Sequence, residues 1–361
     1  MKLRNKVRAI AFYLPQFYPT KENDEWWSPG FTEWTNVAMS KPLFKGHYQP
    51  RIPQKLGFYD LRVPSVREQQ ADLAQEAGIE GFCYWHYGFA GRRLLDQVFR
   101  EVVESGKPDF PFCLCWANHS WKAKTWQADA PDRMLIEQTY PGVSDYTEHF
   151  YAMLPAFKDS RYMKVNGKLI FGIFDAPSFD DNELFIATWN RLAKENGLEG
   201  FYFFALLQQE YKSSQFNHYV FDAVVYDPIQ DAYNTTVYRK YYRRWHEYKV
   251  NKLLRPVPVK YDKYVEYALQ QFKKYPEYIP SIEPDFDHSP RSGHRWVILH
   301  ESTPDKWADL CKRTMDICNR DGEENLLFIK AWNEWGEGNY LEPDMKWGKR
   351  YIEATGSVLK Q

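Results

Sequence analysis

Short apolar runs recur along the chain, and segments with the hydrophobic spacing of amphipathic helices lie between them. Runs of this length, bounded by turn residues, are typical of buried strands. The expected strands cover residues 7–13, 79–85, 110–116, 169–174, 201–206, 223–226, 278–282 and 326–331. The expected helices cover residues 65–78, 92–105, 146–157, 182–196 and 304–320, with two more inside 237–275.

Eight strands that alternate with helices predict an α/β fold, a parallel sheet closed into a (β/α)8 TIM barrel. We see no internal repeat or low-complexity linker, so one domain over residues 1–361 is expected. Residues 14–61 hold too many prolines and glycines for one helix, so they are expected to form a long, aromatic-rich loop at the barrel rim. A doubly wound open sheet is the alternative, and it is disfavoured because no glycine-rich phosphate loop follows the first strand.

Polar or aromatic side chains follow each of the expected strands. In a TIM barrel the carboxyl ends of the strands meet at one face, and active sites lie there. The residues at these positions are Gln16, Phe17 and Tyr18; His86 and Tyr87; Asn118 and His119; Asp175; Gln208 and Gln209; Asp227; Asp285, Asp287 and His288; and Asn333, Glu334 and Glu337. Because the strands were chosen by apolar pattern alone, this regularity favours a real cleft.

Glu334 and Glu337 are the candidate catalytic pair. They lie three residues apart and are flanked by Trp332 and Trp335. Apolar walls raise the pKa of a carboxyl group, and two nearby carboxyls push their pKa values apart. One can then hold a proton while the other is ionised, as acid/base chemistry on a sugar requires. The alternative is an exposed loop with two solvated glutamates.

The aromatic content points to the same chemistry. Aromatic residues make up 18% of the 361 residues, with 14 Trp and 26 Tyr, and sugar-binding clefts use such rings as platforms for the C–H faces of sugars. The candidate substrate-binding residues are Tyr13, Gln16, Trp26, Trp27, Trp34, Tyr84, His86, Trp116, Asn118, His119, Trp121, Asp227, Asp287, Trp332, Asn333 and Trp335. Each loop tryptophan, Trp126 included, is equally well interpreted as loop core, and Asp175 and Asp227 as caps of the segments that follow.

Other classes of function find little support. The formal net charge of −1 gives no sign of a nucleic-acid partner. Three histidines, His86, His119 and His288, are a weak metal signal because they lack dedicated ligand spacing, so neither a metal nor a cofactor is expected. The five cysteines form no CxxC pair and are expected to be buried free thiols.

The sequence has no apolar region behind its basic first residues and no apolar segment long enough to span a membrane. A cytoplasmic location is therefore expected, or a periplasmic one if a leader has been removed. The pattern leaves the oligomeric state open.

Several long motifs carry a family likeness. They occupy residues 12–17, 23–27, 30–36, 42–50, 56–62, 81–84, 111–118, 161–168, 331–338 and 340–344, and so extend over nearly the whole chain. In these motifs the chain resembles the WbsX-like proteins, which are similar to glycoside hydrolase family 99. That family comprises endo-acting α-mannosidases and mannanases with (β/α)8 barrels. WbsX-like proteins are often encoded with polysaccharide or O-antigen biosynthesis genes and are variously labelled glycosyltransferases or hydrolases.

The resemblance also implies roles for the two glutamates. The family pattern Asn-Glu-Trp-x-Glu-Gly matches the chain from Asn333 to Gly338. It implies a retaining reaction through a 1,2-anhydro sugar, in which Glu334 is the base on the 2-hydroxyl and Glu337 is the general acid/base. The chain departs from the WbsX-like pattern at residues 119–121 and 285–288, and both departures add an imidazole to the expected rim of the cleft. These departures bear on substrate identity more than on reaction type.

Three hypotheses follow. The first is a retaining, endo-acting glycoside hydrolase whose partner is an oligo- or polysaccharide, α-mannan-like or from a bacterial surface. The second is a glycosyltransferase in surface polysaccharide or O-antigen biosynthesis. The third is a non-catalytic glycan-binding protein. The first is favoured by the resemblance, and the second is weakened because we find no nucleotide-sugar signature.

Overall fold

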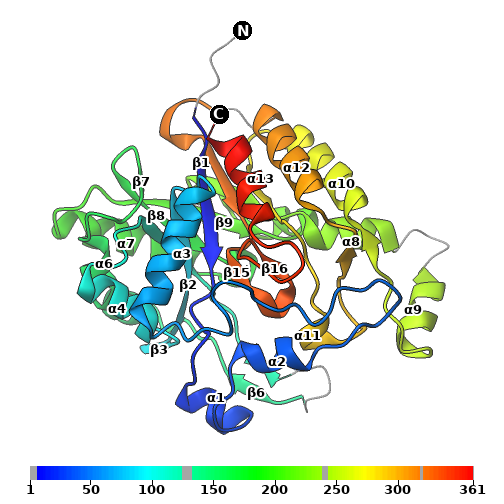
Figure 1. Ribbon diagram of the computed structural model, residues 1–361. Coiled ribbons are helices and arrows are strands. Elements are labelled where there is room, and N and C mark those ends of the chain that lie inside the picture. The colour runs from blue at the N-terminus through cyan, green and yellow to red at the C-terminus, as the bar shows by residue number, and fades with distance from the viewer. Residues whose placement is uncertain (1–5, 124–131, 238–242, 318–319, 361) are drawn as a thin grey trace.

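The computed structural model describes residues 6–123, 132–237, 243–317 and 320–360. Its centre is a closed barrel of eight parallel strands surrounded by helices (Figure 1). The order around the barrel is β1-β14-β12-β10-β9-β8-β4-β2, and pairing of β1 with β2 closes it. The predicted (β/α)8 barrel is confirmed.

Each barrel strand falls on an expected apolar run. The strands are β1 Arg8–Tyr13, β2 Gly81–Phe89, β4 Phe112–Trp116, β8 Lys168–Ile173, β9 Phe201–Leu207, β10 Ala223–Tyr226, β12 Ile279–Ile282 and β14 Leu326–Ile329. Ile10 pairs with Gly81 of β2 on one side and with Phe328 of β14 on the other. The strands are buried on both faces, which explains why they read as nearly continuous apolar runs.

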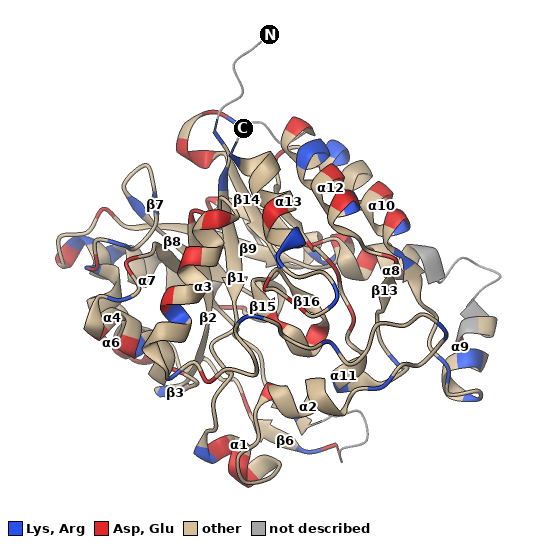
Figure 2. Ribbon diagram, viewed as in Figure 1, with Lys and Arg blue, Asp and Glu red and all other residues tan. Residues whose placement is uncertain are grey.

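The helices pack around the barrel with charged residues on their outer faces, most visibly on α10 and α12 (Figure 2). The longer helices are α3 Pro64–Glu76, α4 Gln97–Ser105, α6 Val143–Phe157, α7 Asn182–Glu195, α8 Ile229–Val237, α9 Arg243–Asn251, α10 Tyr261–Lys274, α12 Pro304–Ile317 and α13 Arg350–Leu359. The expected helices at 65–78, 146–157 and 182–196 are therefore confirmed to within a few residues. The end of the helix expected at 304–320 falls partly outside the described residues.

Several expected elements were wrong in detail. Residues 92–94 form a strand, β3 Arg92–Leu94, because β2 continues past Trp85 and folds back so that Tyr87 pairs with Leu94. The helix expected from residue 92 begins only at Gln97. The long loop at 14–61 contains two short helices, α1 Lys21–Trp26 and α2 Glu33–Met39, each started by a threonine cap. Helices α8 and α13 had no counterpart among the expected elements.

Aromatic rings fill the barrel interior. Phe12 of β1 stacks on Trp85 of β2 at a centroid distance of 4.6 Å, and it also contacts Phe328 of β14. Phe328 meets Phe204 of β9, from a strand that is not its neighbour, at 4.9 Å. These rings can meet only inside the barrel, so they fill its interior. They form the floor of the space at the carboxyl ends of the strands.

The loops at the carboxyl ends of the strands carry α1, α2, β6 and α11, and the described termini lie toward the other end (Figure 1). The short elements of these and neighbouring loops are β5 Trp121–Lys122 with β6 Met134–Ile136, β11 Val259–Lys260 with β13 Leu299–His300, α11 Ser289–Ser292, β15 Asn333–Glu334 with β16 Asn339–Tyr340, and the single turn η5 Trp335–Glu337. The other short elements are β7 Lys164–Val165, η1 Ala176–Ser178, η2 Glu210–Gln215, η3 His218–Val220 and η4 Gly322–Glu324.

Two further sequence expectations concern the thiols and membrane helices. Cys83, Cys113, Cys115 and Cys311 are buried free thiols, as expected, and Cys318 lies outside the described residues. Among the described helices, none has the length and apolar content needed to cross a bilayer. That a single domain extends over residues 1–361 stays a prediction.

Candidate active site

Glu334 and Glu337 lie on a small hairpin that follows β14. The hairpin consists of β15, the turn η5 and β16, with Asn333 paired to Tyr340. Both glycines of the motif, Gly336 and Gly338, are required because there is no room for a Cβ atom at either position. A Cβ on Gly336 would lie 1.8 Å from Oε2 of Glu33, and Gly338 has a φ of 58° and would place a Cβ 2.8 Å from that of Asp287. The glycines noted in the sequence therefore let this loop pack directly against two buried carboxylates.

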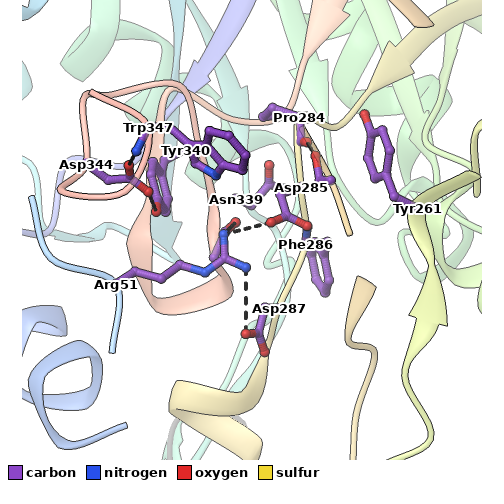
Figure 3. Close-up of polar contacts among 12 residues, drawn as sticks. Arg51, Tyr261, Pro284, Asp285, Phe286, Asp287, Asn339, Tyr340, Asp344 and Trp347 are labelled. Atoms are coloured by element: carbon purple, nitrogen blue, oxygen red, sulfur yellow. Dashed lines mark hydrogen bonds and ion pairs between the residues drawn. The ribbon is translucent and has the colours of Figure 1, made fainter. Parts of the chain in front are cut away.

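A buried ionic network holds the second half of the hairpin (Figure 3). Arg51 pairs with Asp285 at 2.9 Å, lies 3.7 Å from Asp287, and donates to the carbonyl oxygen of Gly338. The backbone N–H of Asp287 donates to the carbonyl of Glu337 at 2.6 Å. Burial would raise the pKa of Asp287, but the hydrogen bond from His47 and the charge of Arg51 lower it to about 2. The ionised network fixes the main chain at Glu337.

Glu342 anchors the tryptophans of the same hairpin. Its carboxylate oxygens accept from the indoles of Trp332 at 3.1 Å and Trp335 at 2.6 Å, and from the side chains of Gln70 and Tyr59. Trp332 and Trp335 are both fully buried. The two indoles beside the glutamates are thus structural anchors of the loop and do not face the cleft.

Glu334 is the carboxyl group that favours the protonated form. It is 4% exposed, and its Oε1 accepts a hydrogen bond from Nε1 of Trp85 at 2.6 Å. Burial is the main cause that raises the pKa of Glu334, to about 8, and the negative charge of Glu337 adds to it. Near neutral pH Glu334 therefore carries a proton in the free protein.

Glu337 is ionised by contrast. Burial would raise its pKa, but the Arg291 guanidinium, with His288 and Lys330 nearby, lowers it to about 2. Arg291 forms a direct ion pair with Oε1 of Glu337 and also binds Glu33 through Nε at 3.0 Å and Nη2 at 2.9 Å. A hydrogen bond links the two side chains of Glu334 and Glu337. The two carboxyl groups therefore share one proton at neutral pH.

Lys330 is a buried cation next to this pair. Its Nζ lies 3.1 Å from Oδ2 of Asp227, and its side chain also lines the space in front of the glutamates. The charges of Asp227, Glu337 and Glu334 raise the pKa of Lys330 despite its burial, so it is charged. The other oxygen of Asp227 accepts from the N–H of Ile229, where α8 begins. Asp227 thus serves as a cap and as the partner of a cation in the cleft.

A cavity of about 850 Å³ opens above the glutamates. One part of its wall is aromatic, formed by Trp85, Tyr87, Trp121, Phe174 and Trp296, and another carries the amides of Gln208, Gln209, Gln230 and Asn234. Rings that stack on apolar sugar faces, together with amides that bond to hydroxyls, match what a glycan presents.

Some of the sequence candidates line this cavity and others do not. Glu334, Glu337, His119 and Trp121 line it. The remaining candidates are absent from its lining: Tyr13, Gln16, Trp26, Trp27, Trp34, Tyr84, His86, Trp116, Asn118, Asp227, Asp287, Trp332, Asn333 and Trp335. Trp126 lies outside the described residues.

Four of the absent residues point toward the helices. Tyr13 and Tyr84 contact each other, and the Tyr13 hydroxyl donates to Gln70 of α3. His86 meets His149 of α6 at 2.6 Å, and Trp116 packs on Phe185 of α7. Side chains alternate between the two faces of a strand, so these positions lie on the outer face while Trp85 and Tyr87 face the cavity.

Other absent residues organise the rim. Asn333 binds both the N–H and the carbonyl of Leu14, and Asn118 binds the same two groups of Asp175. These two amides clamp the backbones at neighbouring strand ends. Trp34 is buried among Phe17, Tyr59 and Trp335, as loop core. Gln16 is also buried, Trp26 packs edge-on against Trp121, and Trp27 lies beside Phe31.

Sequence reasoning missed several residues at the site. Trp85 was assigned only to a strand, and Tyr87 was noted at the strand end without a binding role. Arg291, Lys330 and Trp296 were not singled out at all. One signal was available for Lys330, which is a charged residue inside an otherwise apolar run. Strand alternation separates Trp85 and Tyr87 from Tyr84 and His86, but it does not say which of the two pairs faces inward. The three histidines of the metal alternative do not converge, because His86 points away from the cavity that His119 and His288 line.

Comparison with known proteins adds a family and a fold. The family model for glycosyltransferase WbsX matches residues 9–355. Two curated proteins, both described as uncharacterized protein WxcX, come from Xanthomonas campestris pv. campestris, strains B100 and ATCC 33913. Each is 33% identical to this chain over 97% of its length. The match covers 49% of each relative, so the chain spans about half the length of the curated relatives it matches.

Solved structures share the architecture at low identity. A glycoside hydrolase-like protein superposes with a TM-score of 0.64 at 13% identity, covering 99% of this chain and 95% of its own. The family 99 endo-α-mannosidase from Bacteroides thetaiotaomicron gives a TM-score of 0.59 at 14% identity, covering 98% and 96%. Identities this low carry information about the fold alone.

Proposed function

Because this chain belongs to the WbsX family and carries two hydrogen-bonded glutamates, one buried and one largely buried, above a TIM barrel, we propose that it is a carbohydrate-active enzyme that hydrolyses glycosidic bonds. The observation that carries the proposal is the close pair of Glu334 and Glu337 at the edge of a large cavity, with Trp85 bound to Glu334 and Arg291 bound to Glu337, so that their pKa values shift in opposite directions. Surface glutamates would both be ionised at neutral pH and would give no acid for a leaving sugar oxygen. The substrate we propose is an oligo- or polysaccharide, α-mannan-like or from a bacterial surface, cleaved at internal bonds.

The reaction we propose has two steps. The Glu334 carboxylate takes the proton of the sugar 2-hydroxyl, O2 attacks C1, and Glu337 gives a proton to the departing oxygen, which leaves a 1,2-anhydro sugar. Glu337 then takes a proton from water as the water oxygen attacks C1, and O2 regains its proton from Glu334. Configuration at C1 is retained after two inversions. Lys330 and Arg291 lie close enough to offset negative charge on the carboxylates in both steps.

In the free protein the pKa shifts favour the shared proton on Glu334 and not on Glu337, the proposed acid of the first step. The pKa shifts place the proton on Glu334 and the charge on Glu337, whereas the first step starts from the reverse arrangement. Substrate binding therefore has to move one proton from Glu334 to Glu337. The hydrogen bond between the two carboxyl groups offers a direct path, and a 2-hydroxyl that donates to Glu334 would favour its ionised form.

The alkaline limb of the pH profile follows from this single proton. Since the pKa of Glu334 is raised to about 8, the pair loses its last proton above that pH. We expect kcat/KM to fall about tenfold per pH unit beyond about pH 8, because the species that can protonate a leaving group disappears. Initial rates measured from neutral to alkaline pH check this. A value of kcat/KM that stays level well above pH 8 would contradict the shared proton.

Trp296 is the proposed platform for a sugar ring away from the bond that breaks. Its indole lines the cavity beside His288 and is 49% exposed, so its face is open to a sugar ring. We expect Trp296→Ala to raise KM about tenfold with little change in kcat, because binding that is equal in ground and transition states is lost. The matched control is Trp245→Ala, which removes a 45% exposed indole from α9, outside the cavity lining. If both variants behaved alike, Trp296 would have no role in binding.

The proposed function is tested by incubating the chain with α-mannans and bacterial surface polysaccharides in the absence of any sugar nucleotide. Release of oligosaccharides, detected by mass spectrometry, is the expected result, and products of several sizes would indicate internal cleavage. The name of the family, glycosyltransferase WbsX, favours one second candidate, a glycosyltransferase. Products that form only after sugar nucleotides are added would select it.

A further inference from the structure

The helix α9 and the turn that follows it stand apart from the barrel. In Figure 1, α9 lies at the edge of the molecule, beyond α8. One side of the helix faces inward through Val250, which is 7% exposed. The other side and the turn expose large side chains: Trp245 is 45% exposed, Tyr248 55%, Leu253 45% and Leu254 62%. We refer to residues 245–255 as the α9 surface.

Large apolar side chains clustered on one surface usually mark an interaction site. Residues 245 and 248 are one helical turn apart and therefore share a face, and residue 249 lies next to them. The leucines follow at the end of the helix, where Leu254 adopts a positive φ of 50°. The rings and the leucines therefore lie within one short segment, in which polar and basic residues separate them.

The α9 surface is also basic. Lys249, Lys252 and Arg255 are not buried, and blue positions are visible on α9 in Figure 2. Nζ of Lys249 lies 4.0 Å from the ring centroid of Trp245, so cation and ring are presented together. Residues 245–255 hold three Lys and Arg against a single Glu, in a chain with a net charge of −1. A partner that fits must be anionic and must also accept apolar side chains.

We propose that the α9 surface docks peripherally on an anionic phospholipid bilayer. Basic side chains bind the phosphate groups, tryptophan and tyrosine rings settle at the headgroup level, and the two leucines enter the acyl boundary. An acidic polysaccharide would also attract the basic residues, but it gives adjacent exposed leucines nothing to bury against. The leucines therefore favour lipid. Because α8 lines the cavity through Gln230 and Asn234, a docked α9 would hold the cavity close to the membrane surface.

Sedimentation with lipid vesicles tests this proposal. The chain is mixed with vesicles of equal parts phosphatidylglycerol and phosphatidylcholine, or with phosphatidylcholine alone, at low and high salt. We expect binding to the anionic vesicles that weakens at high salt. We expect the double variant Leu253→Asp with Leu254→Asp to lose roughly tenfold or more in affinity, since it removes apolar insertion and adds repulsion. The matched control is Leu184→Asp, a 43% exposed leucine on α7, which should bind like the wild type.

Three results would overturn the proposal. One is absence of binding to the anionic vesicles, and another is binding that the double variant leaves unchanged. The third is self-association, seen by size-exclusion chromatography, that the double variant abolishes without any lipid, because the surface would then belong to a contact between copies. A melting temperature close to that of wild type ensures that a loss of binding by the variant reflects the surface and not unfolding.

Discussion

Replacing Glu337 by Gln is expected to lower turnover about 10²–10⁴-fold on a competent glycan while leaving the fold intact. The amide has nearly the same shape, but it can neither donate a proton to the leaving oxygen nor take one from water. Glu334→Gln should cause a loss of similar size, because an amide cannot take the proton of the 2-hydroxyl. The measurement is kcat and KM for each variant on the same oligosaccharide.

The control for these variants is Glu353→Gln on the exposed face of α13, which should retain full activity. Arg291 stays paired with Glu33 in Glu337→Gln, so the melting temperature should change little. If Glu337→Gln turned over at the wild-type rate, neither step of the proposed reaction would stand. If only Glu334→Gln remained active, the 2-hydroxyl route would be wrong, and Glu337 alone would carry the chemistry.

Replacing Arg291 by Met is expected to lower the free energy of unfolding by about 3–5 kcal/mol. This guanidinium joins Glu33, which is 2% exposed, to Glu337, and both carboxylates would remain in a buried site without their cation. The pKa of Glu337 should rise toward that of Glu334, so the acid limb of the pH profile should shift to higher pH. Urea unfolding measures the first effect, and the dependence of kcat/KM on pH measures the second.

Two comparisons separate this effect from a simple loss of packing. Arg100→Met removes a half-exposed arginine that pairs with Asp96 and Glu104 on α4, and it should cost at most about 1 kcal/mol. Adding Glu33→Gln to Arg291→Met should recover part of the lost stability, since it removes one of the two stranded charges. A loss for Arg291→Met as small as that for Arg100→Met would show that the buried ion pair contributes little.

The barrel could be predicted because its eight strands are separate apolar runs, and because each run is followed by polar residues at one end. The catalytic candidates could be predicted because Glu334 and Glu337 are close in sequence and lie on one hairpin. The inward face of β2, by contrast, could not be predicted from the sequence. Its residues 84–87 are Tyr, Trp, His and Tyr, so both faces of the strand have aromatic character, and the pattern gives no sign of which side meets the cavity.

The ion pairs that set the electrostatics of the site could not be predicted from the sequence either. Arg291 reaches Glu337 from a short helix more than forty positions earlier in the chain, and its second partner, Glu33, is on α2. Such long-range pairs arise from how the loops fold over the rim. They lower the pKa of Glu337 and so favour the proton on Glu334 in the free protein, which is the reverse of the arrangement that the proposed first step requires.

The most direct test of hydrolysis by this pair is to run the reaction in heavy-oxygen water, without sugar nucleotides, and to analyse the fragments by mass spectrometry. With the wild type we expect one heavy oxygen at each new reducing end, and with Glu337→Gln about 10²–10⁴-fold fewer labelled fragments over the same time. Fragments that lack the label, or labelled fragments released by Glu337→Gln at the wild-type rate, would contradict hydrolysis by this pair.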